Sequence, residues 1–440
     1  MMISFGGVIG TGLFLSSGYT VATAGPVGTI LAYCVGAVIV YLVMLCLGEL
    51  SVAMPETGAF HVYATRFLGP ATGTVPAVLY WLTWTVALGS EFTGAAMIMK
   101  GWFPSTPTWM WAALFITLIL AINITSVRVF AEAETILSSL KVAAIIAFIV
   151  LGGLAIVGLV PYEGYDTAPG LGNLTADGLF PTGIGAVFTT MLAVNFAFSG
   201  TELIGITAGE TRDPGTTIPR AVHATLWRLA VFFIGSVFVM SALIPWRQAG
   251  VEQSPFVTVF NAMGVPYAGT IMSVVILTAI LSAANSGLYA STRMLWSLAN
   301  EGTVPRALAR TNRFGVPALA MGLSMVGGLT ALATSVVAAS TVYLVLVSVS
   351  GLAVVLVWVA IAAAHLSFRR RWVAQGRSTD ELGYAAPGYP WVSVAALLAS
   401  AASCLLIVVD PTQRPALWMT AGFVGACYVT YWVAARRITA

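Results

Sequence analysis

The chain has 440 residues, of which 59% are hydrophobic and only 8% are charged. A soluble domain carries about 25% charged residues, so the composition excludes a protein that folds in water. It is typical of a membrane protein, because a bilayer accepts an apolar exterior. The net charge of +3 does not indicate nucleic acid, and the four cysteines lie in apolar stretches without the spacing of a metal site or a disulfide framework.

Apolar runs separated by glycine, proline and charged residues predict twelve membrane-spanning helices in an all-α bundle. One helix needs about 20 residues to cross the hydrocarbon core, and a helix satisfies its own backbone in lipid. The predicted helices are 3–22, 27–50, 73–99, 107–126, 135–160, 183–209, 223–245, 266–298, 316–335, 340–367, 390–409 and 414–435.

The basic residues predict a multi-pass protein of the cytoplasmic membrane with both termini in the cytoplasm. In this orientation thirteen arginines face the cytoplasm, whereas only Lys100, Arg247 and Arg414 face outward, as the positive-inside rule requires. The cytoplasmic set is Arg66, Arg128, Arg212, Arg220, Arg306, Arg310, Arg313, Arg369, Arg370, Arg371, Arg377, Arg436 and Arg437. The first residues lack a basic signal region, and whether the native start lies upstream of Met1 stays open.

Two predicted helices contain residues that do not suit a helix interior. Four glycines lie between positions 6 and 12 of the first helix, and the sixth contains the segment from Asn195 to Glu202, with an acid at membrane depth. Each glycine costs a helix about 1 kcal/mol relative to alanine, which favours local unwinding. Opened backbone in a bilayer has to line a cavity or contact protein. Close helix packing through small residues is the alternative for the first cluster.

The two interrupted helices each begin a block of five. An odd number of helices per block inverts the second block relative to the first, so the sequence predicts inverted repeats at 1–160 and 183–367, followed by two helices at 390–436. Broken helices at matching positions of inverted halves indicate a transport site near the membrane midplane.

The opened turns offer main-chain groups to a dipolar solute. Exposed amides at Gly10 to Gly12 suit a carboxylate, because the positive end of a helix dipole lies there. Carbonyls on both turns can accept hydrogen bonds from an ammonium group, so the predicted substrate is an amino acid. The predicted contacts on the two turns are Ile9, Gly10, Thr11, Gly12, Phe196, Phe198, Ser199, Gly200 and Glu202.

Several motifs extend nearly from end to end of the chain. They are Gly7-Val-Ile-Gly-Thr-Gly-Leu-Phe14, Leu47-Gly-Glu-Leu with Pro55-Glu-Thr-Gly-Ala-Phe60, Phe198-Ser-Gly-Thr-Glu-Leu203, Gly209-Glu-Thr-Arg-Asp-Pro214 with Ile218-Pro219-Arg220, and Ser282-Ala-Ala-Asn-Ser-Gly287. With these motifs the chain resembles the amino acid permeases of the amino acid–polyamine–organocation (APC) superfamily, and it is most similar to S-methylmethionine permeases. The resemblance implies proton-coupled uptake by alternating access. The chain departs from the family in its missing N-terminal tail and in Glu91, where we expect a small polar residue.

A charged residue at membrane depth is costly, so each one suggests a functional role. For Lys141 the resemblance implies a proton-responsive amine at the sodium position of sodium-coupled relatives, and snorkelling toward the interface is the alternative. For Glu202, pairing with a cationic substrate, carrying a proton and capping exposed amides all stay open. Glu49 lies near a cytoplasmic helix end, where we expect a salt bridge to an arginine.

A sulfonium substrate needs aromatic faces or an acid around it. The aromatic candidates are Trp81, Trp84, Phe198, Tyr289 and Trp296. Ordinary packing is the favoured alternative for each of them except Phe198, whose backbone lies at the predicted break. We expect no cofactor and no metal site, because the three histidines do not cluster in the sequence. Membrane lipid is the expected partner of the arginine run at 369–371, and the oligomeric state stays open.

The predicted function is import of an amino acid by a secondary active transporter, most specifically S-methylmethionine together with protons. A broader permease for neutral or basic amino acids, or an exchanger, would keep the same main-chain contacts and change only the side-chain pocket. An intramembrane enzyme is the alternative from another class. The sequence offers no credible triad, metal motif or acidic pair for it, so we expect no enzyme.

Overall fold

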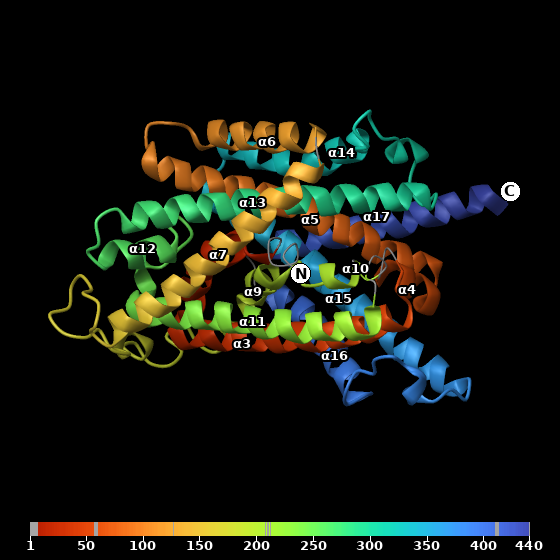
Figure 1. The fold of residues 1–440 in the computed structure, drawn as a ribbon, viewed down its shortest axis with the longest axis horizontal. Coiled ribbons are helices and arrows are strands. Elements are labelled where there is room, and N and C mark those ends of the chain that lie inside the picture. The colour runs from red at the N-terminus through yellow and green to blue at the C-terminus, as the bar shows by residue number, and fades with distance from the viewer. Residues whose placement is uncertain are drawn as a thin grey trace.

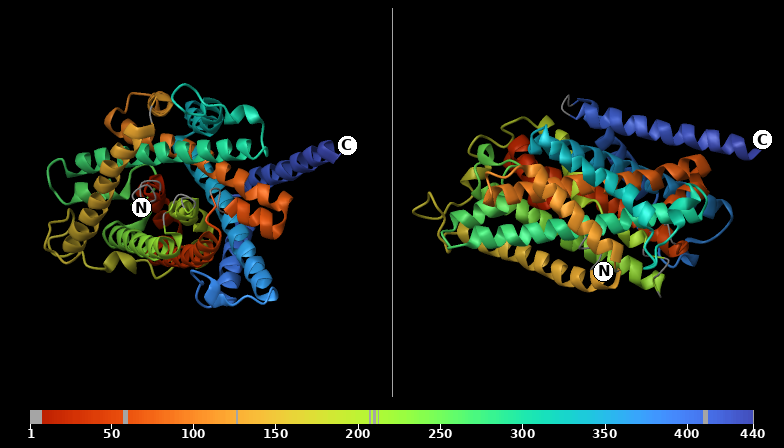
Figure 2. Two further views of the ribbon diagram at one scale, coloured as in Figure 1. Left: turned by 45° about the vertical axis from the view of Figure 1, so that its right-hand side comes forward. Right: turned by 90° about the horizontal axis from the view of Figure 1, so that it is seen from above.

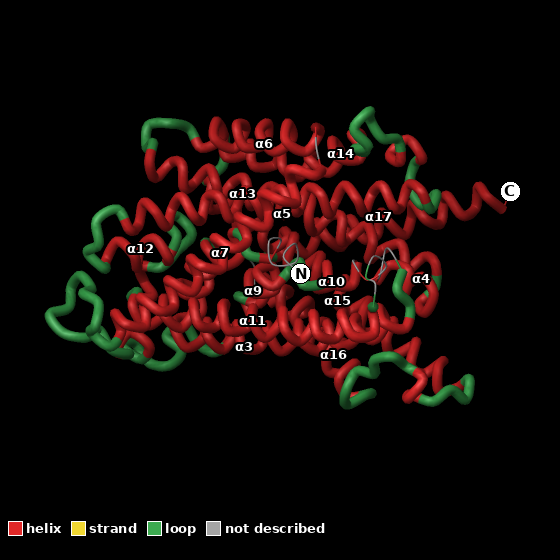
Figure 3. Tube along the Cα trace, viewed as in Figure 1, coloured by secondary structure: helices red, strands yellow, loops and turns green. Residues whose placement is uncertain are grey.

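The computed structural model describes residues 8–56, 60–125, 127–206, 208, 211, 213–409 and 413–439. All regular structure in these residues is helical (Figure 3). Seven of the described helices are long and apolar enough to cross a membrane, and three shorter apolar helices accompany them. The predicted all-helical membrane fold is therefore confirmed, whereas the count of twelve crossings stays a prediction.

The helices follow the order of the apolar runs. The first part of the chain forms α2 (Thr11–Phe14), α3 (Ser16–Ala53), α4 (Phe60–Leu68), α5 (Pro70–Trp102), α6 (Thr108–Thr125) and α7 (Val127–Ile156). The middle part forms α8 (Gly185–Thr189), α9 (Met191–Phe198), α10 (Leu203–Ile206), α11 (Pro214–Leu243), α12 (Pro255–Ala262) and α13 (Ala268–Asn300). The last part forms α14 (Ala318–Leu329), α15 (Ala339–Ala374), α16 (Trp391–Leu405) and α17 (Arg414–Thr439). Short 3-10 turns are η1 (Gly172–Leu174), η3 (Trp246–Gln248), η4 (Arg306–Ala309), η5 (Thr330–Ser335), η6 (Thr379–Glu381) and η7 (Leu406–Val409).

Two predicted helices, 3–22 and 27–50, meet within α3. Gly25 has φ 73° and ψ 175°, which is a conformation that glycine adopts without steric cost. Pro26 then begins the second segment, a position that suits its fixed φ. The Thr29 hydroxyl donates to the Gly25 carbonyl at 2.7 Å and to the Thr20 carbonyl at 2.8 Å. The element α3 is therefore two helical segments joined at a kink.

Two other elements differ from their predicted boundaries. The sixth predicted helix, 183–209, is divided into the short helices α8, α9 and α10. Helix α11 begins at Pro214, well before the predicted start at 223. Its first turns are polar, so they carry no hydrophobic signal, but proline at the first helical position is already shaped for a helix.

The long helices lie side by side along the long axis of the molecule (Figure 1). Helix α12 lies at one end of this axis and α4 lies at the other, whereas α9 and α10 lie near the centre (Figure 1). Helix α17 runs along the outside of the bundle (Figure 2). Only 11% of the residues in its apolar 18-residue stretch are buried. The short central helices are therefore enclosed by long ones.

A buried ion cluster fastens the α4 end of the bundle. Glu49 of α3 is fully buried, and its Oε1 lies 2.6 Å from Nε of Arg369 in α15. Its Oε2 lies 3.1 Å from Nε2 of His365 and accepts a hydrogen bond from the Ala386 amide at 2.6 Å. The cluster joins α3, α15 and the loop after α15, and it confirms the predicted salt bridge of Glu49 to an arginine.

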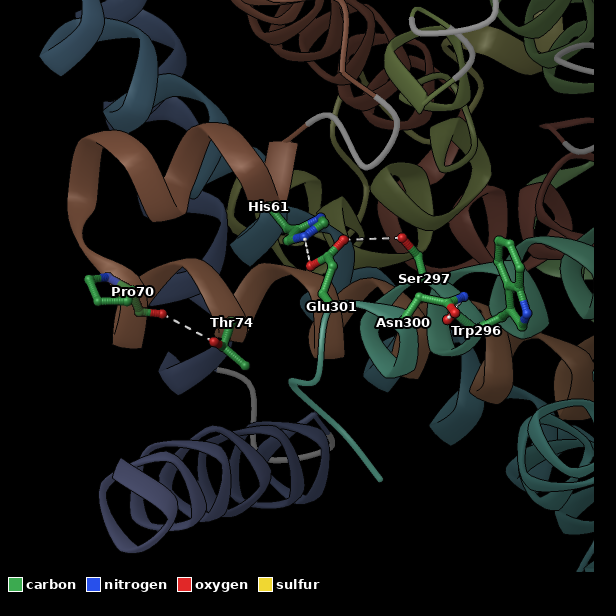
Figure 4. A network of polar contacts seen from close by, with 7 residues as sticks. All are labelled: His61, Pro70, Thr74, Trp296, Ser297, Asn300 and Glu301. Atoms are coloured by element: carbon green, nitrogen blue, oxygen red, sulfur yellow. Dashed lines mark hydrogen bonds and ion pairs between the residues drawn. The ribbon is translucent and has the colours of Figure 1, made fainter. Parts of the chain in front are cut away.

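A second polar network at this end joins α4 to the last turn of α13 (Figure 4). Nε2 of His61 lies 2.9 Å from Oε2 of Glu301, and the Ser297 hydroxyl donates to Oε1 of Glu301 at 3.2 Å. The hydrogen bond with His61 holds the pKa of Glu301 below its usual range. The contribution of Glu301 to stability is therefore present above the ordinary pKa of a glutamate and is lost as the pH falls through the lowered value.

We expect Glu49→Ala to lower thermal stability far more than Glu381→Ala. Removing one member of a buried ion cluster leaves Arg369 without its counter-charge, which costs about 3–5 kcal/mol. The pair of Arg377 and Glu381 is exposed, and such pairs contribute little. Thermal unfolding of both purified variants in one detergent measures the difference. Equal melting temperatures would show that the Glu49 cluster adds no stability.

Candidate functional site

Both predicted helix interruptions are present. The chain leaves α9 at Ser199, which has extended backbone, and becomes helical again at Leu203. Gly200 between them has φ 98°, which favours glycine. Gly10, just before α2, has φ −142° and ψ −147° and is not helical. The backbone is therefore open at both predicted places.

The two opened turns contact each other. A Cβ atom added to Gly12 would lie 2.6 Å from the Cα atom of Ala197 in α9, and one added to Gly200 would lie 3.2 Å from Cγ2 of Val8. The absence of a side chain at Gly12 lets its main chain approach that of α9 directly, and Gly200 leaves space for the Val8 side chain. Gly6 and Gly7, which belong to the same predicted break, lie outside the described residues.

The opened first turn is held by an acid from α5. The Thr11 amide donates to both oxygens of the Glu91 carboxylate, at 3.2 and 3.1 Å, and the Thr11 hydroxyl donates to Oε1 at 3.0 Å. Both side chains are buried. A charge-assisted hydrogen bond to a main-chain amide is among the stronger kinds. The amide that the sequence assigns to a substrate carboxylate is therefore occupied by a carboxylate of the protein.

Two further helices hold the same turn from other directions. The Tyr343 hydroxyl in α15 donates to the Thr11 carbonyl at 3.0 Å. The Ser254 hydroxyl, just before α12, donates to the Phe14 carbonyl at 2.6 Å. The main-chain groups around α2 thus have partners on α5, α15 and the start of α12, which accounts for their burial without a continuous helix.

The second opened turn is stabilised from within. Oε1 of Glu202 accepts a hydrogen bond from the Gly200 amide at 3.0 Å, and the Thr201 hydroxyl donates to Oε2 at 3.4 Å. Glu202 is fully buried. Capping, one of the three roles left open for this acid, is therefore seen in the geometry. Its roles in substrate pairing and proton transfer stay predictions.

A narrow cavity of about 10 Å³ lies where the turns meet, close to the smallest space that holds one water molecule. It is lined from the opened turns, from α5 and from α13. The lining residues are Val8, Gly12, Trp84, Ala87, Leu88, Glu91, Phe196, Ser199, Ala283, Ala284 and Gly287. Four of the predicted contacts, Gly12, Trp84, Phe196 and Ser199, are thus brought together around one space.

A wider cavity of about 1010 Å³ opens at the α12 end of the bundle. Its lining includes Leu15 at the end of α2, Trp102 at the end of α5, and Glu252 and Ser254 before α12. Leu15 lies one helical turn beyond Thr11. The opened first turn therefore lies close to the base of this wider cavity.

Three aromatic candidates make other contacts. The indole of Trp81 donates to the Ser324 hydroxyl in α14 at 3.0 Å. Phe198 packs edge-on against Phe233, with ring centroids 4.8 Å apart. The guanidinium of Arg293 lies 5.9 Å from the ring of Tyr289. None of Trp81, Phe198 and Tyr289 is among the described residues that line the central cavity, and their contact with a substrate stays a prediction.

Lys141 is buried in α7, with 1% of its surface exposed. Snorkelling would place its ammonium at the interface, which does not agree with this burial. The charge of Lys141 acts on Glu91, so the two residues belong to one electrostatic environment. The role of Lys141 in proton coupling stays a prediction.

The residues missed from sequence belong to α5 and α13. For Glu91 the sequence leaves two interpretations open, balance of a positive side chain or a place in the outer vestibule without a role, although an acid in an apolar span is itself a signal. Ala283, Ala284 and Gly287 lie within the small-residue motif that begins at Ser282. In the motif that precedes α11, Gly209, Glu210 and Arg212 lie outside the described residues.

Comparison with known proteins identifies the family. The amino acid permease family matches residues 1–439. A Bacillus subtilis (strain 168) protein named "Putative histidine permease" is 52% identical over 431 residues, which cover 98% of this chain and 91% of that protein. The amino-acid permease RocE of the same organism is 45% identical, covering 99% of this chain and 93% of its own. The lysine-specific permease LysP of Lactococcus lactis subsp. cremoris (strain MG1363) is 40% identical, covering 90% and 80%. The chain therefore belongs to the amino acid permease family, as its motifs predict.

Proposed function

We propose that this chain is a secondary active transporter that imports amino acids across the cytoplasmic membrane by alternating access. The observation that carries the proposal is the contact between two opened turns at a buried cavity. Opened backbone at membrane depth is tolerated where it surrounds a cavity or contacts protein, and paired broken helices are typical of midplane transport sites. Membership of the amino acid permease family supports the same conclusion.

The proposed site holds both ends of the amino acid with main-chain atoms. Because Glu91 occupies the Thr11 amide and the Ser199 hydroxyl donates to the Phe196 carbonyl, we assign the substrate carboxylate to the amide of Gly12, a residue that lines the cavity. The substrate ammonium is assigned to the carbonyls of Val8 and Ile9. This arrangement reads the groups that all amino acids share and leaves selectivity to the walls of the cavity.

For the substrate class, we propose the broader permease for neutral or basic amino acids. Relatives with extensive coverage are named for histidine and lysine, which favours this alternative over S-methylmethionine. S-Methylmethionine has a cationic side chain as well, so it belongs in the same uptake assay as lysine and histidine. An importer and an exchanger would make the same contacts with the substrate. The uptake assay distinguishes the two by the driving force that it imposes.

The remaining elements of the proposal concern architecture and coupling. We propose twelve crossings, inverted repeats at 1–160 and 183–367, and cytoplasmic termini. Protons are the proposed coupling ion, with Lys141 and Glu202 as the titratable groups at depth. Lys141 is buried and acts electrostatically on Glu91, which contacts the first opened turn. The burial of Lys141 and the contact of Glu91 with the first opened turn support a path from a proton to the substrate site.

Uptake by purified protein in proteoliposomes tests the proposal. A panel of labelled lysine, histidine, arginine, S-methylmethionine and leucine is supplied with and without an imposed proton gradient, inside alkaline. We expect accumulation of at least one cationic amino acid above its outside concentration, and only with the gradient. Absence of uptake for the whole panel, in vesicles that contain correctly inserted protein, would refute the transport function.

Gly10→Val should abolish uptake while leaving membrane insertion intact. A Cβ atom at Gly10 would lie 2.6 Å from Oε1 of Glu91 and 2.9 Å from Cβ of Ala283. The valine would therefore displace Glu91 from Thr11 and disturb the opened turn. Gly153→Val is the matched control, because a Cβ atom at this position of α7 meets nothing within 4 Å. Substantial uptake by Gly10→Val would argue against a site at this turn.

Lys141→Ala should flatten the pH dependence of uptake. An ammonium that gains and loses a proton during transport imposes its titration on the rate, and alanine removes that group. Lys100→Ala is the control, because Lys100 is an exposed lysine at the end of α5. Uptake of labelled lysine is measured from pH 5 to 9 in all three proteins. An unchanged pH profile in Lys141→Ala would remove this residue from the coupling path.

A further inference from the structure

We propose that an anionic phospholipid binds in a groove between α3 and α11, with one acyl chain in the groove and its phosphate at the polar end formed by Tyr41 and His223. The inference concerns the outer surface of the bundle, so it goes beyond the transport function and does not depend on it. It follows from the shape of the groove, from its depth along two membrane-length helices and from the polar groups at one end.

The groove lies on the outside of two helices that pack side by side (Figure 1), and its volume is about 830 Å³. One stripe of residues on each helix lines it, including Ala37, Val38 and Tyr41 on α3 and Ala224, Trp227 and Ala230 on α11. The alanines leave space that larger side chains would fill. Val38 and Trp227 are 57% and 74% exposed. Both helices are long and apolar enough to cross a membrane, so this apolar face contacts lipid.

The depth of the groove matches one leaflet of the bilayer. Helix α11 ends at Leu243, and about 20 residues cross a hydrocarbon core about 30 Å thick, so counting back from Leu243 places Ala224 at the boundary of the headgroups. His223 lies at this boundary. Ile234, at the other end of the groove, lies about 16 Å deeper at the helical rise of about 1.5 Å per residue. The groove therefore extends from headgroup level to near the middle of the bilayer, which is the depth of one acyl chain.

The hydrogen-bonding groups gather at the headgroup end of the groove. Oη of Tyr41 and Nδ1 of His223 lie 3.1 Å apart and share a hydrogen bond. A neutral imidazole and a phenol each carry one hydrogen that can be donated. The pair uses one of them internally and retains the other for an outside acceptor. No acid is among the described residues that line the groove. An ionised phosphodiester, which has acceptors and no donor, therefore suits this end.

Arg220 supplies the positive charge that favours an anionic lipid. It is exposed and lies three residues before His223, so both residues project from the same face of α11. Arg220 is the nearer of the two to the start of the helix, on the water side of the headgroup boundary. Arginine can bind a phosphate through two parallel hydrogen bonds. Basic residues just outside a membrane-spanning segment attract anionic lipids.

The headgroup is the part of the lipid that this groove can select. Acyl chains of all phospholipids are apolar, and the groove exchanges one apolar surrounding for another. Phosphatidylglycerol carries one net negative charge, whereas the choline of phosphatidylcholine cancels the charge of its phosphate. Trp227 has the amphipathic ring that is typical of the membrane interface, and it serves both lipids alike. The arrangement therefore predicts a preference for phosphatidylglycerol over phosphatidylcholine with the same chains.

Native mass spectrometry of the delipidated protein measures this preference directly. The protein is kept in detergent micelles that contain palmitoyl-oleoyl phosphatidylglycerol or phosphatidylcholine, and the Kd of the first bound lipid is determined for each. We expect the wild-type protein to bind phosphatidylglycerol about tenfold or more tightly, the scale of a charge-assisted hydrogen bond. Equal Kd values for the two lipids would overturn the proposal.

Arg220→Gln tests the charge at the headgroup end. Arg220 is exposed, so glutamine removes the charge without disturbing packing, and the preference for phosphatidylglycerol should fall about fivefold or more. Arg313→Gln is the matched control, because Arg313 is also exposed and its guanidinium lies over the ring of Phe314, outside the groove. This control should keep the preference. An unchanged preference in Arg220→Gln, or an equal fall in both variants, would refute a phosphate site at the groove.

Ala230→Phe tests the place of the acyl chain. The larger side chain fills the groove, so the Kd of phosphatidylglycerol should rise about fivefold or more, the loss of roughly ten carbon contacts. Ala421→Phe puts the same side chain on an exposed position of α17 and should leave the Kd unchanged. If Ala230→Phe fails to insert, His223→Leu removes the polar pair instead and should lower the preference for phosphatidylglycerol. An unchanged Kd in Ala230→Phe, or an unchanged preference in His223→Leu, would place the lipid elsewhere.

Discussion

The bond between the Glu91 carboxylate and the main chain of Thr11 is the contact on which the opened first helix depends. A main-chain amide without a partner is costly at membrane depth, and the amide of Thr11, the first residue of α2, has no preceding helical turn to accept from it. Glu91 on α5 accepts from this amide, and Tyr343 on α15 donates to the Thr11 carbonyl. Since they belong to two separate long helices, this conformation of the turn exists only within the assembled bundle.

The second turn is stabilised differently. Glu202 lies two residues from Gly200 and accepts a hydrogen bond from its amide, so this turn carries its own cap. A displacement of α5 or α15 would change the partners of the first turn and leave the cap of the second intact. The geometry thus couples the first turn to α5 and α15 and gives the second turn a cap from its own residues. Such an asymmetry suits a site that has to change its exposure while keeping hold of a solute.

The rest of the bundle supports this centre. At the α4 end, Glu49, Arg369 and His365 tie α3 to α15, and α15 is also the helix that holds the Thr11 carbonyl. At the α12 end, Ser254 bonds to the Phe14 carbonyl beside the wider cavity. Long helices anchored at both ends therefore determine where the opened turn lies between the two cavities.

The sequence by itself determined the membrane class, the approximate helices and both interruptions, because apolar runs and glycine clusters are local properties of a chain. It also identified Gly12, Trp84, Phe196 and Ser199, which line the cavity. Only the tertiary structure decided that Glu91 meets Thr11, 80 residues away in sequence, and that Trp84 faces the cavity while Trp81 bonds to Ser324. A helix that is apolar on all sides has no hydrophobic face to indicate its rotation, so the neighbours of each side chain are settled only when the helices pack together.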